Sequence, residues 1–326
     1  MSDIYHIPND NGKDYRLKKF VEYQHEVPSI HYRFLGEYIK RHGFTKDEAL
    51  DMCFLMTITY NELTCILLFE MLKSMTPEEI WDKYKADLSF GSARKYAKNN
   101  DQFAELIEGW RSLTHNMPSE WLFSQILPSE EQTCKKIQAA IQNVPNVGRF
   151  ASDLFIEMIV YLRDYLGIKV KEPAEIDWKN CANLTSGIFN IFYEDEKANE
   201  FDRTKKVTPL EIRYLSSKLR IIQKAIQEEY PEQDSEISMF IGKICSFRNL
   251  FKNARYGGFH HDRQLGVLRE YEKKFTKYHV IWEECYRIRE AIFPDRFLGE
   301  KHGWDGIRKE RKRLWLTTGK TGVEYE

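Results

Sequence analysis

The sequence has almost no net charge, because 49 Lys and Arg residues stand against 50 Asp and Glu residues, which gives −1 at pH 7. This balance excludes a polycationic, histone-like binder but leaves room for a local basic groove. The 6 cysteines include no CxxC pair, which argues against a disulfide framework or a zinc site and favours reduced, buried thiols. HExxH and GxSxG motifs are also missing, so two common hydrolase signatures are absent.

A long uninterrupted apolar run is missing as well. Residues 1–14 are polar and lack the apolar core of a signal peptide. The most apolar stretch, residues 52–72, contains Asn61, Glu62 and Glu70, which a membrane span rarely tolerates. We therefore expect a buried helix there, no membrane partner and a cytoplasmic location.

Strict two-residue alternation, the pattern of a half-buried strand, is nearly absent, whereas apolar residues recur at spacings of three, four and seven. Capping-box or proline-start patterns precede these repeats at residues 45–48, 76–79, 129–132 and 208–211. The sequence therefore predicts an all-α protein with loops at residues 90–100 and 167–206. The helices are expected at residues 16–25, 28–41, 46–74, 77–86, 101–113, 118–126, 130–142, 148–166, 209–229, 234–253, 262–278 and 280–292.

No low-complexity linker interrupts the chain, so we expect a single compact helical domain over residues 1–326. Two lobes, residues 1–127 and 128–300, are the natural subdivision if one exists. Residues 301–326 are rich in Lys and Arg and are expected to form a basic C-terminal tail.

The segment from residue 141 to 165 is expected to hold a helix, a Pro- and Gly-containing turn and a second helix. In a helix-hairpin-helix, the turn amides and the N-terminus of the second helix offer hydrogen-bond donors to a phosphate. Asn146 lies in this turn, Gly148 allows close approach, and Arg149 adds a full charge. These residues are candidate DNA contacts, although an ordinary αα-hairpin without a ligand has the same spacing.

Acidic side chains follow on the second of these helices. Asp153 and Glu157, with Asp164 beyond them, fall within a narrow arc beside the apolar stripe. Such carboxylates act as general acids or bases when a pocket raises their pKa values. A half-solvated helix edge paired with Lys or Arg gives the same pattern, so both interpretations remain.

Two basic and aromatic segments are candidate nucleic-acid contacts. The first contains Arg94 and Lys95, and the second contains Arg255, Tyr256 and Arg263 around a double glycine. Cations with a stacking ring suit a phosphate and base surface. The alternative is a helix end whose cations interact with the dipole and whose glycines end the helix.

The order of these segments resembles a known family. The hairpin at residues 144–151 resembles that of helix-hairpin-helix DNA glycosylases, and the whole of residues 90–263 resembles a divergent bacteriophage branch of that group. This branch comprises the α-glutamyl/putrescinyl-thymine pyrophosphorylases, or amino acid:DNA transferases. Asn146 stands where glycine is usual, and Asn183 and Thr185 stand where the branch tends to have glycine or proline. The residues that carry the resemblance are Phe90, Gly91, Arg94, the hairpin, Ile176, Asp177, Trp178, Ser186, Gly187, Ile188, Cys245, Ser246, Phe247, Arg255, Tyr256, Gly257, Asp262 and Arg263.

The resemblance implies a helix-hairpin-helix glycosylase-like fold and a reaction on phage DNA in the cytoplasm of the bacterial host. Such enzymes replace the pyrophosphate of 5-pyrophosphorylmethyl-uracil with the amine of an amino acid or polyamine, on a flipped base. Asp177 matches the glycosylase carboxylate and is the first candidate for the acid/base role, followed by Glu157 and Asp153. Arg94, Lys95, Arg149, Arg255 and Arg263 are implied phosphate or pyrophosphate ligands, and Tyr256 is an implied base-stacking residue. The resemblance requires no metal and no organic cofactor.

Two other functions fit the same residues. A DNA glycosylase of the helix-hairpin-helix type is one, although Ser152 lies near the position where bifunctional members carry a nucleophilic lysine. A non-catalytic helical DNA-binding protein is the other, favoured by the near-neutral charge and the lack of a catalytic triad.

Overall fold

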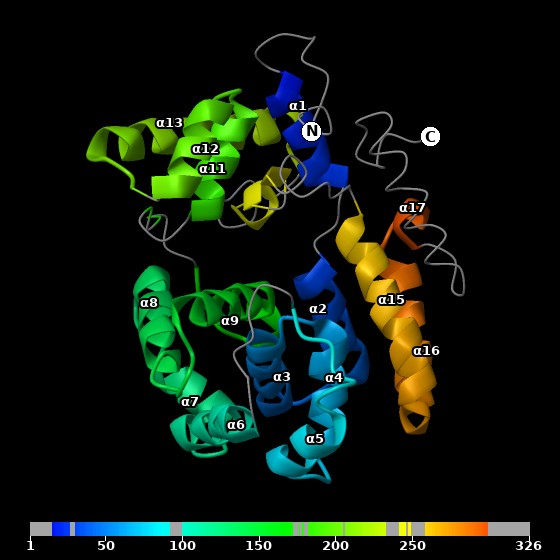
Figure 1. The fold of residues 1–326 in the computed structure, drawn as a ribbon. Coiled ribbons are helices and arrows are strands. Elements are labelled where there is room, and N and C mark those ends of the chain that lie inside the picture. Colours follow the sequence, from blue (N-terminus) through cyan, green and yellow to red (C-terminus); the bar gives the residue numbers. More distant parts are fainter. Residues whose placement is uncertain are drawn as a thin grey trace. The chain divides into compact units, whose positions relative to one another are not determined.

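The computed structural model describes most of the chain, and every regular element within that part is a helix (Figure 1). The predicted all-α class is therefore confirmed for the described residues. These are residues 15–26, 30–91, 100–171, 176, 178, 182–204, 206–232, 241–245, 247–248 and 258–298.

Contacts divide the chain into two compact units, each built from separate stretches of sequence. Unit 1 comprises Met1–Pro28, Ala174–Leu265 and Pro294–Glu326, and unit 2 comprises Ser29–Pro173 and Gly266–Phe293. The lobe boundary expected between residues 127 and 128 thus falls inside unit 2. Residues 301–326, the expected basic tail, lie outside the described residues.

Unit 2 packs its helices around an aromatic core. The ring of Trp110 stacks on Phe54 at 4.8 Å between centroids and meets Trp121 and Phe155 edge-on. Rings of this size supply much of the buried apolar area of a helical core. Its helices are α2 (Ile30–His42), α3 (Lys46–Thr59), α4 (Glu62–Met71), α5 (Pro77–Tyr84), α6 (Asn100–Thr114), α7 (Pro118–Ser124), α8 (Glu130–Ile141), α9 (Arg149–Tyr161), α10 (Arg163–Leu166), the end of α15 (Phe259–Lys274), η3 (Thr276–Tyr278) and α16 (His279–Ile292).

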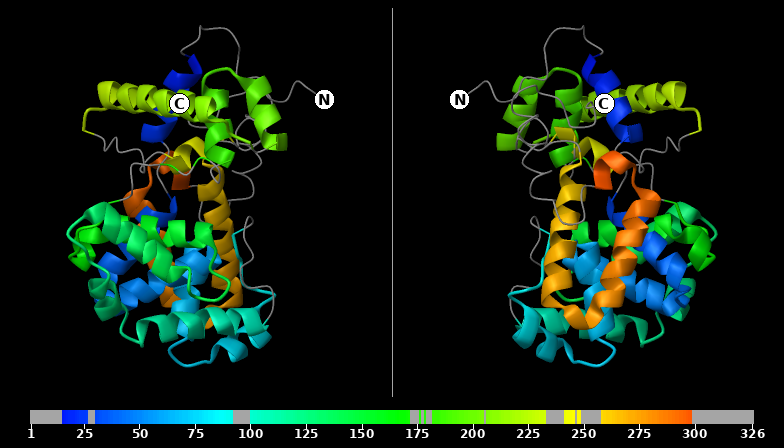
Figure 2. Two further views of the ribbon diagram at one scale, coloured as in Figure 1. Left: turned by 90° about the vertical axis from the view of Figure 1, so that its left-hand side faces the viewer. Right: turned by 90° about the vertical axis from the view of Figure 1, so that its right-hand side faces the viewer.

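The last two long helices of unit 2, α15 and α16, contact helices from the beginning of that unit. Helices α15 and α16 lie side by side (Figure 2), and Tyr271 of α15 packs against Trp282 of α16. The buried hydroxyl of Tyr271 shares a hydrogen bond with the Thr64 hydroxyl at 2.7 Å and accepts one from the backbone N–H of Ser89 at 2.7 Å. These bonds fix a late segment of the chain against α4 and the segment after α5.

The core of unit 1 includes the ring of Phe247, which meets Phe20 at 5.4 Å and Tyr23 at 5.5 Å between centroids. The guanidinium of Arg16 donates to the Asn190 carbonyl at 2.8 Å and forms an ion pair with Asp195 at 2.9 Å. This side chain therefore ties the first helix to the middle of the chain. The helices are α1 (Tyr15–Glu26), α11 (Ala182–Ile191), α12 (Asp195–Thr204), α13 (Pro209–Glu229), residues 241–245, the start of α15 and α17 (Asp295–Leu298).

The single helix predicted over residues 46–74 is wrong, because the chain breaks between α3 and α4. Tyr60 adopts a left-handed conformation with φ 47°, and Asn61 then caps α4 by accepting hydrogen bonds from the N–H groups of Leu63 and Thr64. The apolar composition hides this break, since both helices are buried on nearly every side.

The loop predicted over residues 167–206 is also wrong, because the described part of it contains α11 and α12. Leu184, Ile188 and Ile191 are buried along one face of α11, so tertiary packing outweighs the helix-weakening effect of Gly187. The helix predicted over residues 148–166 divides at Leu162 into α9 and α10. Within the described residues, no helix is both long and apolar enough for a membrane crossing.

Candidate nucleic-acid interface

The candidate interface is the turn of residues 142–148, which joins α8 to α9 in unit 2. Val144 and Val147 are buried and anchor the turn to the core, whereas Asn143, Pro145 and Asn146 are exposed. Helix α6 supports the turn closely, because a Cβ atom at Gly109 would lie 2.6 Å from Cδ of Pro145. The turn is therefore held in one place while its outer edge faces solvent.

Gly148, the N-cap of α9, is also exposed to solvent. Its backbone has φ −85° and ψ 176°, no side chain caps the helix, and a Cβ built there would meet nothing within 4 Å. An uncapped first turn carries N–H groups and a partial positive charge. The sequence interpretation required this corner to be exposed, and it is.

The opposite side of the turn is less suited to an anion. Asn146 has φ 63°, a conformation that Asn tolerates better than other side chains, which explains how it replaces the usual glycine. Its amide donates a hydrogen bond at 3.0 Å to the carboxylate of Glu105, an exposed residue of α6. A phosphate near Asn146 would meet this negative charge, so close backbone contact is favoured at Gly148 instead.

Arg149 and Asp153 lie one helical turn apart at the start of α9. Nε of Arg149 is 3.9 Å from Oδ2 of Asp153, and both side chains are about one-third exposed. Asp153 also accepts a hydrogen bond from the Gln138 amide, which joins α8 to α9. These partners favour a helix-joining role for Asp153 over an acid/base role.

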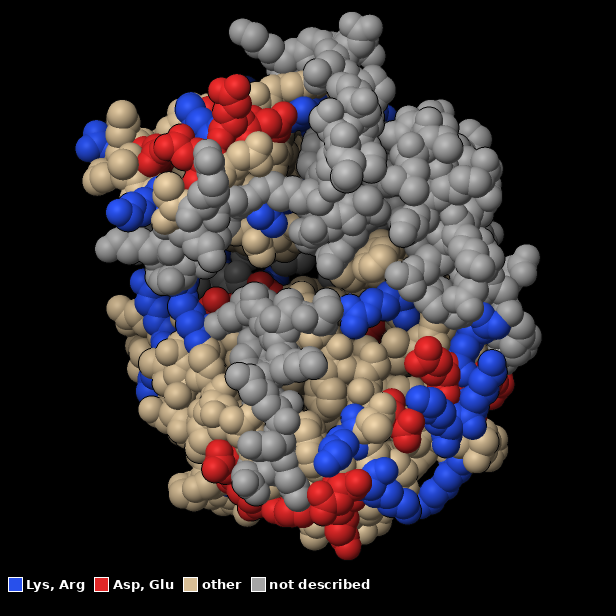
Figure 3. All heavy atoms as spheres, in the orientation of Figure 1, with Lys and Arg blue, Asp and Glu red and all other residues tan. Residues whose placement is uncertain are grey.

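Basic and acidic side chains separate across the face shown in Figure 3. Lys and Arg gather beside α8, on the left of that view, and Asp and Glu gather along the lower edge, over α5 and α6. Exposed Lys135 and Lys136 belong to α8, whereas exposed Glu105 and Glu108 belong to α6. A polyanion docked on the turn would therefore be attracted toward α8 and repelled from α6.

The structure brings only part of the predicted site together. Asn146, Gly148, Arg149, Asp153 and half-buried Glu157 all lie on the turn or on α9 in unit 2. Arg263 is half-buried in α15 and belongs to unit 1. The remaining predicted site residues lie outside the described residues: Arg94, Lys95, Asp177, Arg255 and Tyr256.

Several residues that carry the family resemblance have packing roles. A Cβ at Gly187 would lie 2.6 Å from Cγ2 of Ile244, so this glycine lets α11 approach residues 241–245. Buried Ser186 accepts a hydrogen bond at 3.0 Å from Nε of Arg248, and burial lowers the pKa of that guanidinium. Phe247 and Asp262 are buried. The order of these motifs thus reflects the architecture of unit 1 as well as any chemistry.

The sequence interpretation missed a buried ionisable pair at the break between α3 and α4. Glu62 is buried, and its Oε2 lies 2.7 Å from Nδ1 of His31 in α2. The His31 ring also packs against the ring of Tyr60, the left-handed residue. Strained backbone beside a buried carboxylate is a pattern found at functional sites. The available signal was Glu62 itself, an acid within an otherwise apolar stretch.

Comparisons of the chain with protein-family models, with curated proteins and with solved structures returned no match.

Proposed function

We propose that this protein is a DNA base-modifying transferase that replaces pyrophosphate on 5-pyrophosphorylmethyl-uracil with the amine of an amino acid or polyamine. The observation that carries the proposal is the exposed turn between α8 and α9, with its uncapped helix N-terminus at Gly148 and the partly exposed Arg149 beside it. The resemblance of residues 90–263 to the phage transferases supports the choice of reaction.

The proposed reaction forms one C–N bond and breaks one C–O bond. The amine nitrogen bonds to the methylene carbon on C5 of the base, and pyrophosphate leaves with the electron pair of the C–O bond. A carboxylate takes the proton that the attacking ammonium must lose, and we assign this role to Asp177, with Glu157 as the alternative. The glycosidic bond stays intact, which distinguishes this reaction from that of a glycosylase.

Charge complementarity requires that the DNA backbone run along α8 and the N-terminus of α9. The donors available there are the first-turn N–H groups of α9, the guanidinium of Arg149 and the exposed Lys135 and Lys136. Arg94 and Lys95 remain proposed DNA contacts, Arg255 and Arg263 the proposed ligands of the departing pyrophosphate, and Tyr256 the proposed stacking residue. The target base leaves the stack for the reaction.

One assay tests the reaction. The protein is incubated with DNA that contains 5-pyrophosphorylmethyl-uracil and with a mixture of amino acids and polyamines, and the digested nucleosides are identified by mass spectrometry. An amine-substituted nucleoside with release of pyrophosphate supports the transferase. Abasic sites would indicate a glycosylase, and unchanged DNA that is nevertheless bound would indicate a non-catalytic DNA-binding protein.

The Asp177→Asn variant tests the assigned acid/base residue. It should abolish turnover while DNA affinity stays close to that of the wild-type protein, because the amide keeps the shape of the carboxyl but cannot take a proton. Turnover at the wild-type rate would remove Asp177 from the mechanism. Glu157→Gln, measured in parallel, shows whether the acid of α9 performs the step instead.

The Arg149→Ala variant tests the proposed docking of the turn on the DNA backbone. It should weaken DNA binding equally for different sequences and lower the slope of log K against log salt concentration by about one unit, as expected for one lost phosphate contact. Lys169→Ala, which removes an exposed cation elsewhere in unit 2, serves as the matched control. An equal change in slope for both variants would contradict a specific contact at the turn.

A further inference from the structure

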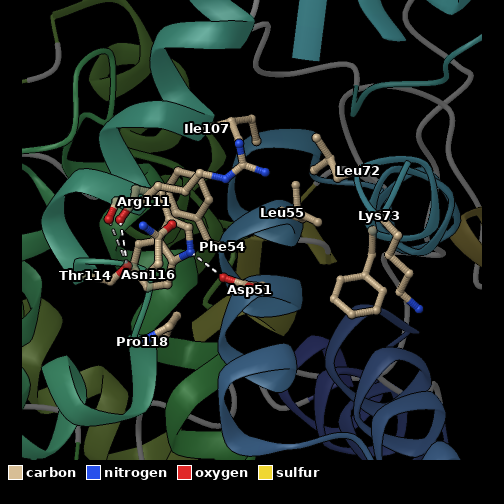
Figure 4. A pocket seen from close by; sticks show the side chains of 12 residues that line it. Asp51, Phe54, Leu55, Leu72, Lys73, Ile107, Arg111, Thr114, Asn116 and Pro118 are labelled. Carbon is tan, nitrogen blue, oxygen red and sulfur yellow. Dashed lines mark hydrogen bonds between the residues drawn. The ribbon is translucent and has the colours of Figure 1, made fainter. Parts of the chain in front are cut away.

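Unit 2 contains a recess that the proposed reaction does not use. It lies over α3, between α6 and α4, and has a volume of about 180 Å³ (Figure 4). A recess of this size can hold a small organic molecule. Its walls are mostly apolar, with Leu55 on α3, Ile107 on α6 and Leu72 after α4.

A single carboxyl group, that of Asp51, stands among these apolar walls. Its Oδ1 accepts a hydrogen bond at 2.7 Å from the indole N–H of Trp110. Among the described residues this carboxyl makes no other hydrogen bond, so an ionised Asp51 has further acceptor capacity toward the recess. Figure 4 shows Asp51 on α3, beside Arg111 of α6 and on the far side of the recess from Lys73.

The charges around Asp51 leave the recess with a negative end. Burial is the main reason that the pKa of Asp51 is raised to about 6, and the nearby acids Asp47 and Glu48 of α3 act in the same direction. The indole N–H of Trp110 and the charge of Arg111 act in the opposite direction but do not cancel the effect.

The two cations at the rim of the recess already have acidic partners. Arg111 pairs with Glu108 at 2.8 Å, and Lys73 pairs with Glu70 at 2.8 Å. Each of these cations is therefore paired with a carboxylate that does not line the recess, and the carboxylate of Asp51 remains the group that a ligand would neutralise. A bound cation would remove the electrostatic penalty of its burial.

We propose that this recess binds a small primary ammonium ion, with its charged head on Asp51 and its carbon body against Leu55 and Ile107. An ammonium group supplies the donors that the carboxylate accepts, and an alkyl chain of about butyl size fills the apolar space. A metal ion fits less well, since the described residues contain no group of three His, Cys, Asp or Glu side chains that could hold one. The inference rests on the recess alone and not on the proposed action on DNA.

Calorimetric titration of the full chain with n-butylammonium, beside its neutral analogue butan-1-ol, tests the proposal. Butylammonium should bind with a constant affinity at pH values above 6. Below pH 6 its affinity should fall about ten-fold for each pH unit, because protonation of Asp51 then competes with the ligand. Butan-1-ol should bind at least about ten-fold more weakly and without this pH dependence. Equal binding of the two molecules, or no binding of butylammonium at any pH, would overturn the proposal.

Variants distinguish the contribution of the Asp51 carboxylate to binding from that of the cavity itself. Asp51→Asn keeps an acceptor for the Trp110 indole but removes the charge, so it should weaken butylammonium binding by at least about ten-fold. Glu120→Gln, at an exposed position of α7, makes the same change of net charge and should leave binding unchanged. Leu72→Trp fills the recess from the side of α4 and should abolish binding even if Asp51→Asn fails to fold. Retained binding in a folded Asp51→Asn or Leu72→Trp protein would place the ligand elsewhere.

Discussion

Gly187 and Gly242 lie in facing helical segments of unit 1 and have opposite surroundings. A Cβ at Gly187 would lie 2.6 Å from Cγ2 of Ile244 and 2.9 Å from its carbonyl oxygen, whereas a Cβ at Gly242 would meet nothing within 4 Å. A side chain can rotate away from a new methyl group, but a carbonyl oxygen moves only with its backbone. Substitutions at these two positions therefore distinguish the effect of close packing on stability from the effect of the backbone flexibility of glycine.

Gly187→Ala should destabilise unit 1 by about 1–3 kcal/mol, because the residues around Ile244 must shift to admit the methyl group. Gly242→Ala should instead stabilise by about 0.5–1 kcal/mol, since it removes only the entropic cost of a helical glycine. Hydrogen exchange of the α11 amides measures both changes. Equal effects of the two substitutions would show that contact with Ile244 does not explain Gly187.

The hairpin shows how far residue patterns alone can lead. The proline, the glycine and the flanking apolar periods were enough to predict the helices on both sides of the turn, because those signals are local. The Glu105 carboxylate beside Asn146 could not be foreseen, because Glu105 is 41 residues away in the sequence. The recess around Asp51 escaped prediction for the same reason, since its indole partner lies 59 residues away.

At the scale of the element, helix starts were easier to predict than helix ends. The capping boxes at Thr45, Thr76 and Thr208 are present, because each depends on side chains only three residues apart. The break between α3 and α4 has neither glycine nor proline. It depends on Tyr60 holding φ 47°, in contact with His31 of another helix. Such a break follows from tertiary packing, which periodicity does not report.

The cap at this break gives a prediction for the stability of α4. Asn61 is nearly buried, and its Oδ1 accepts from the N–H groups of Leu63 at 3.1 Å and Thr64 at 3.0 Å. Asn61→Ala should cost about 2 kcal/mol, the upper end of the range for caps, because water replaces the lost acceptor poorly at a buried site. Urea unfolding measures the loss, and hydrogen exchange should place it in α4.

An exposed cap provides the matched control for Asn61. Ser129 accepts from the N–H of Gln132 at 3.3 Å at the start of α8, where solvent can take its place. Ser129→Ala should therefore cost less, about 0.5–1 kcal/mol. An equal loss for the two variants would mean that burial does not strengthen the Asn61 cap.

At the scale of the whole molecule, the order of elements in the chain differs from their grouping in space. The sequence suggested a single compact domain, with two lobes that follow one another as its possible subdivision, because composition and periodicity describe neighbours in the chain. Unit 2 instead includes Gly266–Phe293, which follows a long stretch of the chain that belongs to unit 1. In the sequence, an apolar helix face that packs on a helix distant in the chain has the same pattern as one that packs on the next helix.

This grouping predicts that residues 29–173 do not fold cooperatively without the returning helices. Those helices supply Tyr271 and Trp282, both fully buried, and the Tyr271 hydroxyl is the hydrogen-bond partner of Thr64 and of the Ser89 N–H. A fragment of residues 29–173 should show helical circular dichroism but weak near-ultraviolet signals. Addition of a separate peptide of residues 259–293 should restore those signals and a sharp urea transition, whereas a Tyr271→Ala peptide should do so poorly, because the cavity and the unpaired N–H of Ser89 cost several kcal/mol. A sharp transition for the fragment alone would show that the returning helices are not required for the core of unit 2.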